Sequence, residues 1–221
     1  MKQIIKKAEP NSLVQHRTQT HASFDNIPLE TKQELRQSLL SEQGYICCYC
    51  MKRIPEHTQP YMKVEHYKCQ DNFGELQLTY TNLFGACTGN EGKPKKLQTC
   101  DTKKGNDVLT INLLANNPSC ETLFKYNSDG EISSASNDSE INRQLNEVLN
   151  LNMQSLKDAR REIYLEVQER IRVKSKKDKA SFVKFLEQEK TRWLERTDNK
   201  HKPYCSVAVY YLTKKIKSNQ N

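Results

Sequence analysis

The sequence lacks the features that would place it in or across a membrane. It has no run of about 18 apolar residues, which excludes a membrane-spanning helix. Its first residues, MKQIIKKAEP, carry charge without a long apolar stretch behind it, so we expect no signal peptide. We therefore expect a cytoplasmic protein whose thiols stay reduced.

Apolar residues are also scarce, at 35% of the chain, and the mean hydropathy is −0.87. A core built from so few apolar residues is small for 221 residues, and a metal ion or a partner is expected to support it. Basic residues outnumber acidic ones by 35 to 27, which gives a net charge of +8. This balance favours a polyanionic partner over an acidic small substrate.

The chain is predicted to be α+β, with a metal-supported unit followed by an all-helical half. We divide it into an N-terminal arm (1–29), a compact domain (30–124), a linker (125–138) and a helical region (139–221). The arm shows little periodicity, and the linker holds a turn at 127–130 and then Ser, Asn and Asp residues.

Local patterns predict the elements within these parts. A helix is expected over 30–43, because Leu35, Leu39 and Leu40 share one face and Gly44 is a natural terminator. Brief strands are expected at Val64 and over 80–84, with a loop over 88–96. Apolar positions mark four helices in the last part: Ile141, Leu145, Val148 and Leu149; Leu156, Ile163, Val167 and Ile171; Phe182, Phe185, Leu186 and Trp193; and Val207 to Ile216.

Eight cysteines, in a reducing compartment, indicate metal ligands and spare thiols rather than a disulfide framework. Cys47 and Cys50 have the C-x2-C spacing at which two thiolates meet one tetrahedral ion, and Cys87 and Cys100 are the best second pair. The alternative is that these are ordinary buried cysteines. Such a zinc ion would be structural, because four protein ligands leave no position for an activated water. The remaining cysteines are predicted to pack rather than to bind: Cys48, Cys69, Cys120 and Cys205.

Between the cysteine pairs lies KVEHYKCQDNFGELQLTYTNLFGAC, and CDTKKGN follows it. Glu65 and His66 are adjacent, Asn82 stands five residues before Cys87, and Asp101 directly follows Cys100. Taken singly, each of these residues has an ordinary structural interpretation. Together, E-H, N-L-x-x-x-C and C-D-x-x-K-G resemble the HNH motif of ββα-metal nucleases with zinc-binding cysteines. The departure is Asp101, which stands where that family has His or Asn.

The resemblance implies roles for these residues in phosphodiester hydrolysis. His66 would be the general base, and Glu65 and Asp101 would hold one divalent cation, magnesium being the leading candidate. A carboxylate binds a hard cation at least as well as the usual residue would, so Asp101 changes the coordination more than the activity. Asn82 would orient His66 through hydrogen bonds to nearby backbone.

Several lysines lie near this motif, and lysines that neutralise phosphates give sequence-independent binding to nucleic acid. We expect Lys104 to be the strongest phosphate contact because it lies within the motif. Taken singly, each lysine is as well explained as part of a solvated loop. The other candidates are Lys95, Lys96 and Lys103, with Lys93 beside them. A second basic stretch, over 170–179, is expected to be an exposed helix end.

The likeness extends to both ends of the chain. MKQIIKKAEPNSL, LLSEQGYICCYCMKRI, TYTNLFGACTGNEG, TCDTKKGN and PYCSVAVYYLTKKIK resemble the retron-associated HNH endonucleases, the PtuB-like proteins of Septu-type anti-phage systems. This resemblance implies a defence role beside a PtuA-like ATPase, sometimes with a retron reverse transcriptase and its msDNA. It implies DNA as the nucleic acid that is cut, with tRNA as a second candidate, and a helical region that docks on the partner.

Two alternatives stay open at this stage. A non-catalytic, zinc-stabilised nucleic-acid-binding module would need the four cysteines and the lysines, but not Glu65, His66, Asn82 and Asp101 together. A free-standing HNH restriction-type nuclease would need no ATPase partner.

Overall fold

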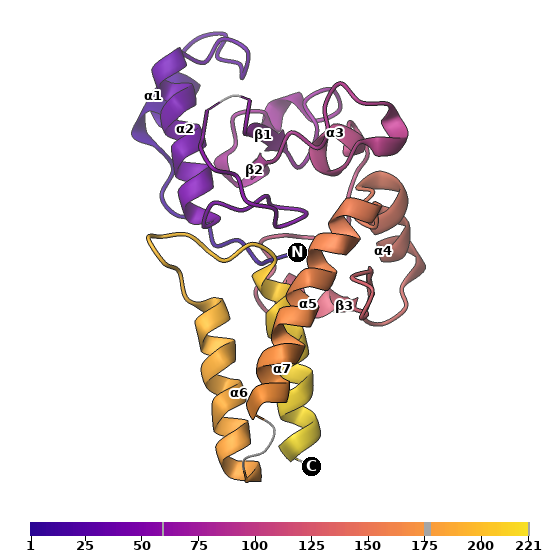
Figure 1. The fold of residues 1–221 in the computed structure, drawn as a ribbon. Helices are drawn as coiled ribbons and strands as arrows, with labels where there is room; N and C mark the ends of the chain where they lie inside the picture. The colour runs from indigo at the N-terminus through magenta and orange to yellow at the C-terminus, as the bar shows by residue number, and fades with distance from the viewer. Residues whose placement is uncertain (59, 175–177, 221) are drawn as a thin grey trace.

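The computed structural model describes residues 1–58, 60–174 and 178–220. Figure 1 shows an elongated molecule, with the N-terminal helices and the first small sheet at one end and three long helices extending toward the other. The helices are α1 (Asn11–Arg17), α2 (Leu29–Glu42), α3 (Cys100–Lys104), α4 (Ser139–Arg143), α5 (Gln154–Lys174), α6 (Lys179–Leu194) and α7 (Cys205–Gln220). A π-helical turn, η5 (Gln144–Val148), continues α4.

The strands form two separate antiparallel pairs. The first pair is β1 (Lys63–His66) with β2 (Leu83–Ala86), and the second is β3 (Phe124–Tyr126) with β4 (Ile132–Ser134). Short 3-10 turns connect these elements: η1 (Gly74–Leu76), η2 (Tyr80–Asn82), η3 (Lys95–Leu97) and η4 (Cys120–Leu123). The predicted α+β class is confirmed.

Helix α2 confirms the helix expected over 30–43. Its apolar face is buried at Leu35, Leu39 and Leu40, as the spacing requires. Gly44 follows the helix with φ +61, a conformation that favours glycine. A Cβ atom at this glycine would lie 2.5 Å from Cδ2 of His201, so the close approach also requires glycine.

The long helices of the C-terminal part are also confirmed. Leu156, Val167 and Ile171 are buried on α5, and α6 packs along α7 (Figure 1). The buried face of α6 consists largely of Phe182, Leu186 and Trp193. The basic stretch expected over 170–179 spans the end of α5 and the start of α6, and its residues 175–177 lie outside the described part of the chain.

The first 29 residues differ from the predicted irregular arm. Helix α1 lies within them, and four of their apolar residues are buried in the core: Met1, Ile4, Leu13 and Ile27. The Lys6 ammonium also donates to Glu42 on α2, 2.6 Å away. These apolar residues are buried one at a time along an irregular path, which leaves no period in the sequence.

The segment over 125–138 is not a plain linker, because β3 and β4 form a hairpin there. The expected turn is present, with the Gly130 N–H donating to the Asn127 carbonyl over 2.9 Å. The Asn152 side chain bonds both backbone groups of Ile132 and ties the hairpin to the chain before α5. Strands of three residues are too short to show alternation. Similarly, the strand expected over 80–84 begins only at Leu83, after the turn η2.

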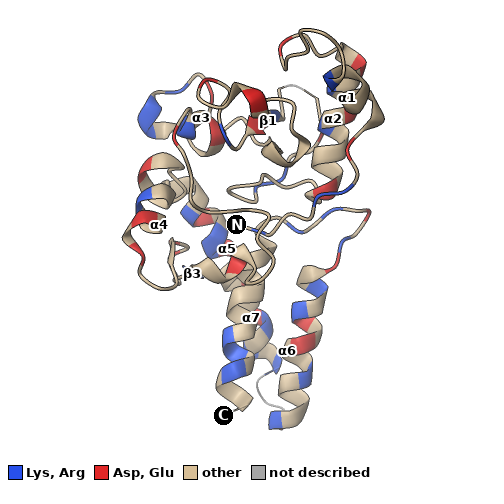
Figure 2. Ribbon diagram, turned by 180° about the vertical axis from the view of Figure 1, so that it is seen from behind, with Lys and Arg blue, Asp and Glu red and all other residues tan. Residues whose placement is uncertain are grey.

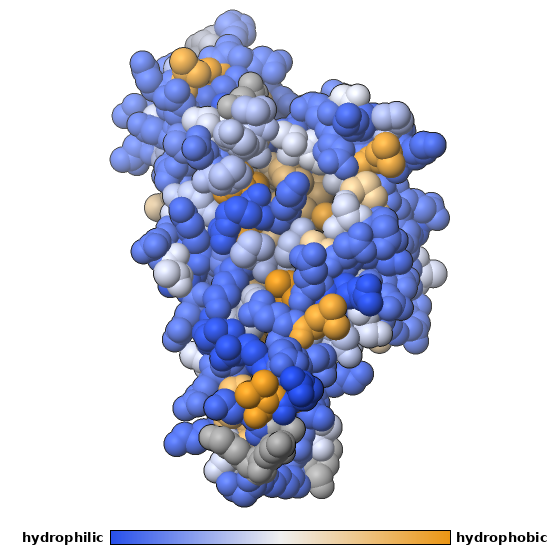
Figure 3. All heavy atoms as spheres, in the orientation of Figure 1, coloured by the Kyte–Doolittle hydropathy of each residue, from blue (hydrophilic) through white to orange (hydrophobic). Residues whose placement is uncertain are grey.

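The core is one connected cluster of apolar side chains that reaches from Met1 to Ile216. The zinc-ligand region and the helical region therefore share a core rather than forming two independent units. The face seen in Figure 3 is mostly hydrophilic, with apolar side chains in small separate groups. Across the described ranges, no helix combines the length and apolar character that a bilayer crossing demands.

Candidate metal centre and active site

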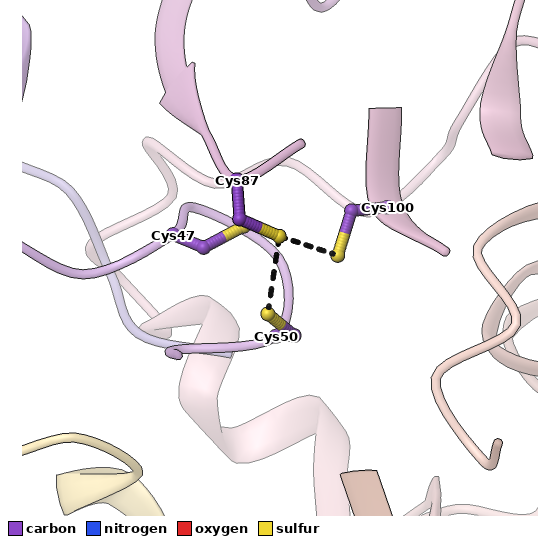
Figure 4. A group of neighbouring side chains, drawn as sticks. All are labelled: Cys47, Cys50, Cys87 and Cys100. Atoms are coloured by element: carbon purple, nitrogen blue, oxygen red, sulfur yellow. Dashed lines mark hydrogen bonds between the residues drawn. The ribbon is translucent and has the colours of Figure 1, made fainter. Parts of the chain in front are cut away.

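The four predicted cysteine ligands converge on one point, although they come from three parts of the chain. Cys47 and Cys50 lie on the turn after α2, Cys87 directly follows β2, and Cys100 is the first residue of α3. Their sulfur atoms all lie within 4.8 Å of one another (Figure 4). Three are buried and Cys87 is half-buried, so the centre is largely shielded from solvent.

The sulfur spacing fits a tetrahedral zinc ion. Sγ of Cys87 lies 3.8 Å from Sγ of Cys50 and 3.8 Å from Sγ of Cys100. Four Zn–S bonds of about 2.3 Å, at tetrahedral angles, place neighbouring sulfurs about 3.8 Å apart. A disulfide would need about 2.0 Å, and all four cysteines are free. The cysteines are therefore positioned to hold a structural metal ion, and zinc fits them.

The backbone of the first pair stabilises this arrangement. The Met51 N–H donates to the Cys47 carbonyl over 3.1 Å, and the Lys52 N–H donates to Sγ of Cys50 over 3.4 Å. Met51 has φ +64, which turns the chain sharply enough for both sulfurs to face the same side.

The thiols of the cluster influence one another's ionisation. Burial opposes ionisation of Cys47, but hydrogen bonds from Cys100 and the neighbouring thiols outweigh it and hold the pKa of Cys47 well below its usual range. The same contact with Cys47 raises the pKa of Cys100 well above its usual range. Without a cation, the Cys47 thiolate thus suppresses ionisation of the neighbouring Cys100 thiol. A divalent ion would allow all four sulfurs to bind as thiolates.

A second group of predicted residues lies beside this centre. Glu65 and His66 end β1, where they pair with Phe84 and Leu83 of β2. Asp101 follows Cys100 directly, so a metal ion held by the four cysteines would fix the start of α3 against β1. Glu65, His66 and Asp101 all line one open cleft of about 470 Å³.

Glu65 is a buried carboxylate with three ionisable neighbours. Its Oε1 accepts from the Tyr49 hydroxyl over 2.6 Å and from the Lys104 ammonium over 2.9 Å. Burial raises the pKa of Glu65 well above its usual range, and the adjacent Asp101 carboxyl raises it further, while Lys104 and Tyr49 act in the opposite direction. A buried carboxyl group and a second carboxyl group that opposes its ionisation, beside an open cleft, form a suitable pair of ligands for a hard divalent cation.

The ring of His66 is held in one orientation. Its Nε2 lies 3.1 Å from the Gln77 carbonyl oxygen, and because a carbonyl only accepts, Nε2 carries the hydrogen. The ring of Phe24 meets it edge to face at 4.4 Å. Burial lowers the pKa of His66, which keeps the ring neutral near pH 7. Nδ1 of the neutral ring is then the nitrogen that can accept a proton.

Asn82 does not line the cleft but fixes the loop that carries the His66 partner. Its Oδ1 accepts from the Lys68 N–H over 2.8 Å, and its Nδ2 donates to the carbonyls of Lys68 and Leu76 over 3.0 and 3.2 Å. Leu76 precedes Gln77, so the amide of Asn82 positions the segment that orients the His66 ring.

The lysines divide into two groups. Lys104 is buried, and its ammonium contacts Glu65 and the His66 carbonyl, so it is not available to a phosphate at the surface. This corrects the expectation that Lys104 is the main phosphate contact: its place in the motif reflects a need to neutralise Glu65. Lys95 and Lys96 are exposed on η3, and Lys103 on α3 lies beside them, with its ammonium 3.4 Å from the Lys95 carbonyl.

The comparisons with known proteins point to a nuclease. No family model matches the chain. The Escherichia coli protein named "Retron Ec83 putative HNH endonuclease" is 25% identical, over 74% of this chain and 79% of its own length. This likeness supports, at most, a relationship to HNH endonucleases and associates the relative with a retron.

Two residues of the site, Tyr49 and Lys63, were not predicted from the sequence. Tyr49 lies between Cys48 and Cys50, and nothing in the C-x2-C pattern indicates that its hydroxyl reaches Glu65. Lys63 forms ion pairs of 3.2 Å with both Asp101 and Glu91. Its position two residues before Glu65 is a signal that could have found it, because alternate residues of a strand share a face.

Proposed function

We propose that this chain is a metal-dependent endonuclease of the HNH type, which hydrolyses phosphodiester bonds in nucleic acid. One observation carries the proposal: Glu65, His66 and Asp101 meet in one cleft beside a four-cysteine metal centre. A module that only binds nucleic acid has no need for a buried carboxylate, an oriented neutral imidazole and a second carboxylate in one place.

The proposed chemistry assigns each residue one task. His66, with Nε2 donating to Gln77, accepts the proton of the attacking water at Nδ1. Glu65 and Asp101 would hold a divalent cation, and magnesium suits their oxygen ligands. When bound, that cation would polarise the scissile phosphate and neutralise the leaving oxygen. Asn82 is a positioning residue, because it acts on the His66 ring through the backbone.

The surroundings of the cleft fit a polyanionic substrate. Lys95, Lys96 and Lys103 lie on η3 and α3 next to it, and Figure 2 shows basic residues gathered around α3. Contacts from such lysines to phosphates carry no sequence information, so cleavage with little sequence preference is expected. DNA is the first candidate substrate and tRNA the second.

The finer role we propose is that of an effector in bacterial defence. It rests on the sequence resemblance to Septu-type, PtuB-like proteins and on the retron named in the relative. In this role, the helices α5 to α7 would dock on a PtuA-like ATPase, alone or with a reverse transcriptase and its msDNA. Affinity purification of the tagged chain from its native cells should recover an ATPase, and recovery of none would contradict the role.

Cleavage measured against magnesium concentration tests the site itself. The substrates are labelled single-stranded DNA, duplex DNA and tRNA. Glu65→Gln removes a proposed ligand and should reduce the cleavage rate by at least about 100-fold, with a higher magnesium requirement. Glu91→Gln is the matched control, since Glu91 lines the same cleft but is exposed and pairs with Lys63. Equal rates for the two variants would contradict the assignment.

A further inference from the structure

Four tyrosines form a continuous chain of rings on the side of the molecule built by α5, α7 and β3. Tyr126 meets Tyr210 edge to face at 5.5 Å, Tyr210 meets Tyr211 at 5.3 Å, and Tyr211 meets Tyr164 at 4.6 Å. Three of these rings are only partly buried. None of the four lines the proposed active-site cleft.

Two open clefts flank this chain of rings. One, of about 450 Å³, lies between α7 and the segment that includes η4 and β3. The other, of about 430 Å³, lies between α7, Tyr164 of α5 and the β3–β4 hairpin. Tyr126, Tyr210 and Lys214 line both clefts. The clefts therefore adjoin, with the Tyr210 ring and the Lys214 side chain, one helical turn further along α7, between them.

The charge around these clefts is positive. Lys214 and Lys217 are exposed, and among the residues that the structure describes neither has an ion-pair partner at the cleft. The carboxylate that lines the first cleft, Glu121, already has partners within the protein. It forms an ion pair with Lys2 at 3.1 Å and accepts a hydrogen bond from the Ser206 hydroxyl over 2.9 Å. Figure 2 shows the basic residues that follow one another along this part of α7.

Tyr211, which lines the second cleft, has an unpaired polar group. The Tyr211 hydroxyl is buried and has no hydrogen-bond partner within the described part of the chain. A buried hydroxyl without a partner costs free energy, and an ordered water beside it would satisfy it.

Partly exposed aromatic rings beside exposed lysines match the chemistry of a single strand of nucleic acid. Bases present flat faces that stack on aromatic side chains, and each phosphate offers a charge to an ammonium group. In a duplex the base faces are covered by their neighbours and cannot reach the rings. An acidic peptide would use the lysines but has no flat groups to place on the tyrosines.

We propose that the two clefts along α7 bind single-stranded nucleic acid, with bases on the tyrosine rings and phosphates on Lys214 and Lys217. This surface is distinct from the cleft of Glu65 and His66. The proposal does not depend on nuclease activity, because binding is measured separately from cleavage.

Fluorescence anisotropy on the full chain tests the proposal. His66→Ala is the background in which the strand stays intact, and the probe is an oligothymidylate of about 12 nucleotides, within the site sizes usual for such surfaces. Lys214→Glu with Lys217→Glu should weaken binding at least about tenfold. Lys179→Glu with Lys184→Glu on α6 is the matched control: both lysines are exposed, the charge change is the same, and binding should weaken less than about threefold.

Two further comparisons test the rings. Tyr210→Leu should weaken binding about tenfold, while Tyr210→Phe should stay near the original affinity, because a base stacks on either aromatic ring. A strand of abasic units with the same number of phosphates, and a duplex of the same length, should both bind at least about fivefold more weakly than oligothymidylate. Circular dichroism establishes that each variant is folded.

Three results would overturn the proposal. Equal weakening by the α7 and α6 lysine pairs would mean that only overall charge matters. Equal binding of the abasic strand and oligothymidylate would exclude stacking on the rings. Binding of poly-glutamate that depends on Lys214 and Lys217, in place of the oligonucleotide, would identify an acidic protein segment as the ligand. Loss of cleavage by His66→Ala bears only on the nuclease, so the two proposals fail separately.

Discussion

Replacing Cys87 by serine removes the ligand that lies at 3.8 Å from both Cys50 and Cys100. The substitution changes one atom at a half-buried position, so it disturbs packing little. A neutral hydroxyl is a much weaker zinc ligand than a thiolate. We expect zinc to bind the variant much more weakly, which loosens the contact between β2, α3 and the turn that carries Cys47 and Cys50.

The expected loss of folding stability in Cys87→Ser follows from the number of zinc ligands. Structural zinc binding contributes about 10–16 kcal/mol, so one of four equal ligands accounts for about 3–4 kcal/mol. The free energy of unfolding of a whole domain is about 5–15 kcal/mol. In a chain of this length, each kcal/mol moves Tm by about 2–4 °C, so Cys87→Ser should lower Tm by about 10 °C.

Thermal melting and metal analysis check this prediction together. Cys48→Ala is the matched control, because Cys48 is a buried cysteine of the same turn but lies outside the four-sulfur cluster. The control should keep about one zinc per chain and lose only about 2–4 °C, the effect of about 1 kcal/mol. If both variants keep one zinc per chain and melt at the same temperature, the structural role of the metal centre is refuted.

Three further predictions concern other parts of the molecule. Gly130 has φ +79 and would place a Cβ atom 2.0 Å from the Lys157 carbonyl, so Gly130→Ala should destabilise by more than about 2 kcal/mol in a thermal melt. Gly92→Ala is the control, because Gly92 has φ +78 but open space around it, and this variant should lose clearly less stability. Burial lowers the pKa of His201 to about 4. Between about pH 6.5 and pH 4 the imidazole of the unfolded chain therefore binds a proton that the folded chain does not bind, and the free energy of unfolding falls as the pH drops through this range. Between pH 7 and pH 5, His201→Gln should therefore lose about 2 kcal/mol less than the wild type, and an equal loss would exclude this cause. Asn82→Ala should slow cleavage about 10–100-fold at unchanged zinc content, and an unchanged rate would remove its positioning role.

Sequence patterns predict much of this structure where the signal is local. The apolar spacing of α2, α5, α6 and α7 is regular over several turns, so these helices can be located from the residues. The C-x2-C of Cys47 and Cys50 indicates a metal site that needs a second pair of ligands, and the four sulfurs do converge.

Sequence patterns do not predict the structure where it depends on contacts between residues far apart in the chain. The β3–β4 hairpin has three-residue strands, and its contact with the chain before α5 comes through Asn152, which no local pattern announces. Lys104 lies in a basic run that suggests exposure, yet it is buried because Glu65 needs a counter-ion. Tyr49 reaches the same carboxylate only because the cysteine turn folds over β1. Such contacts are set by the tertiary fold.

The single-turnover cleavage rate of His66→Ala tests the central claim most directly. Without the imidazole that accepts the water proton, the rate in magnesium should fall about 100- to 10,000-fold, and added imidazole should restore part of it. His57→Ala is the control, since His57 lies outside the cleft of Glu65 and Asp101, and it should cut at the wild-type rate. A His66→Ala variant that cuts within about threefold of the wild type would contradict general-base catalysis by His66.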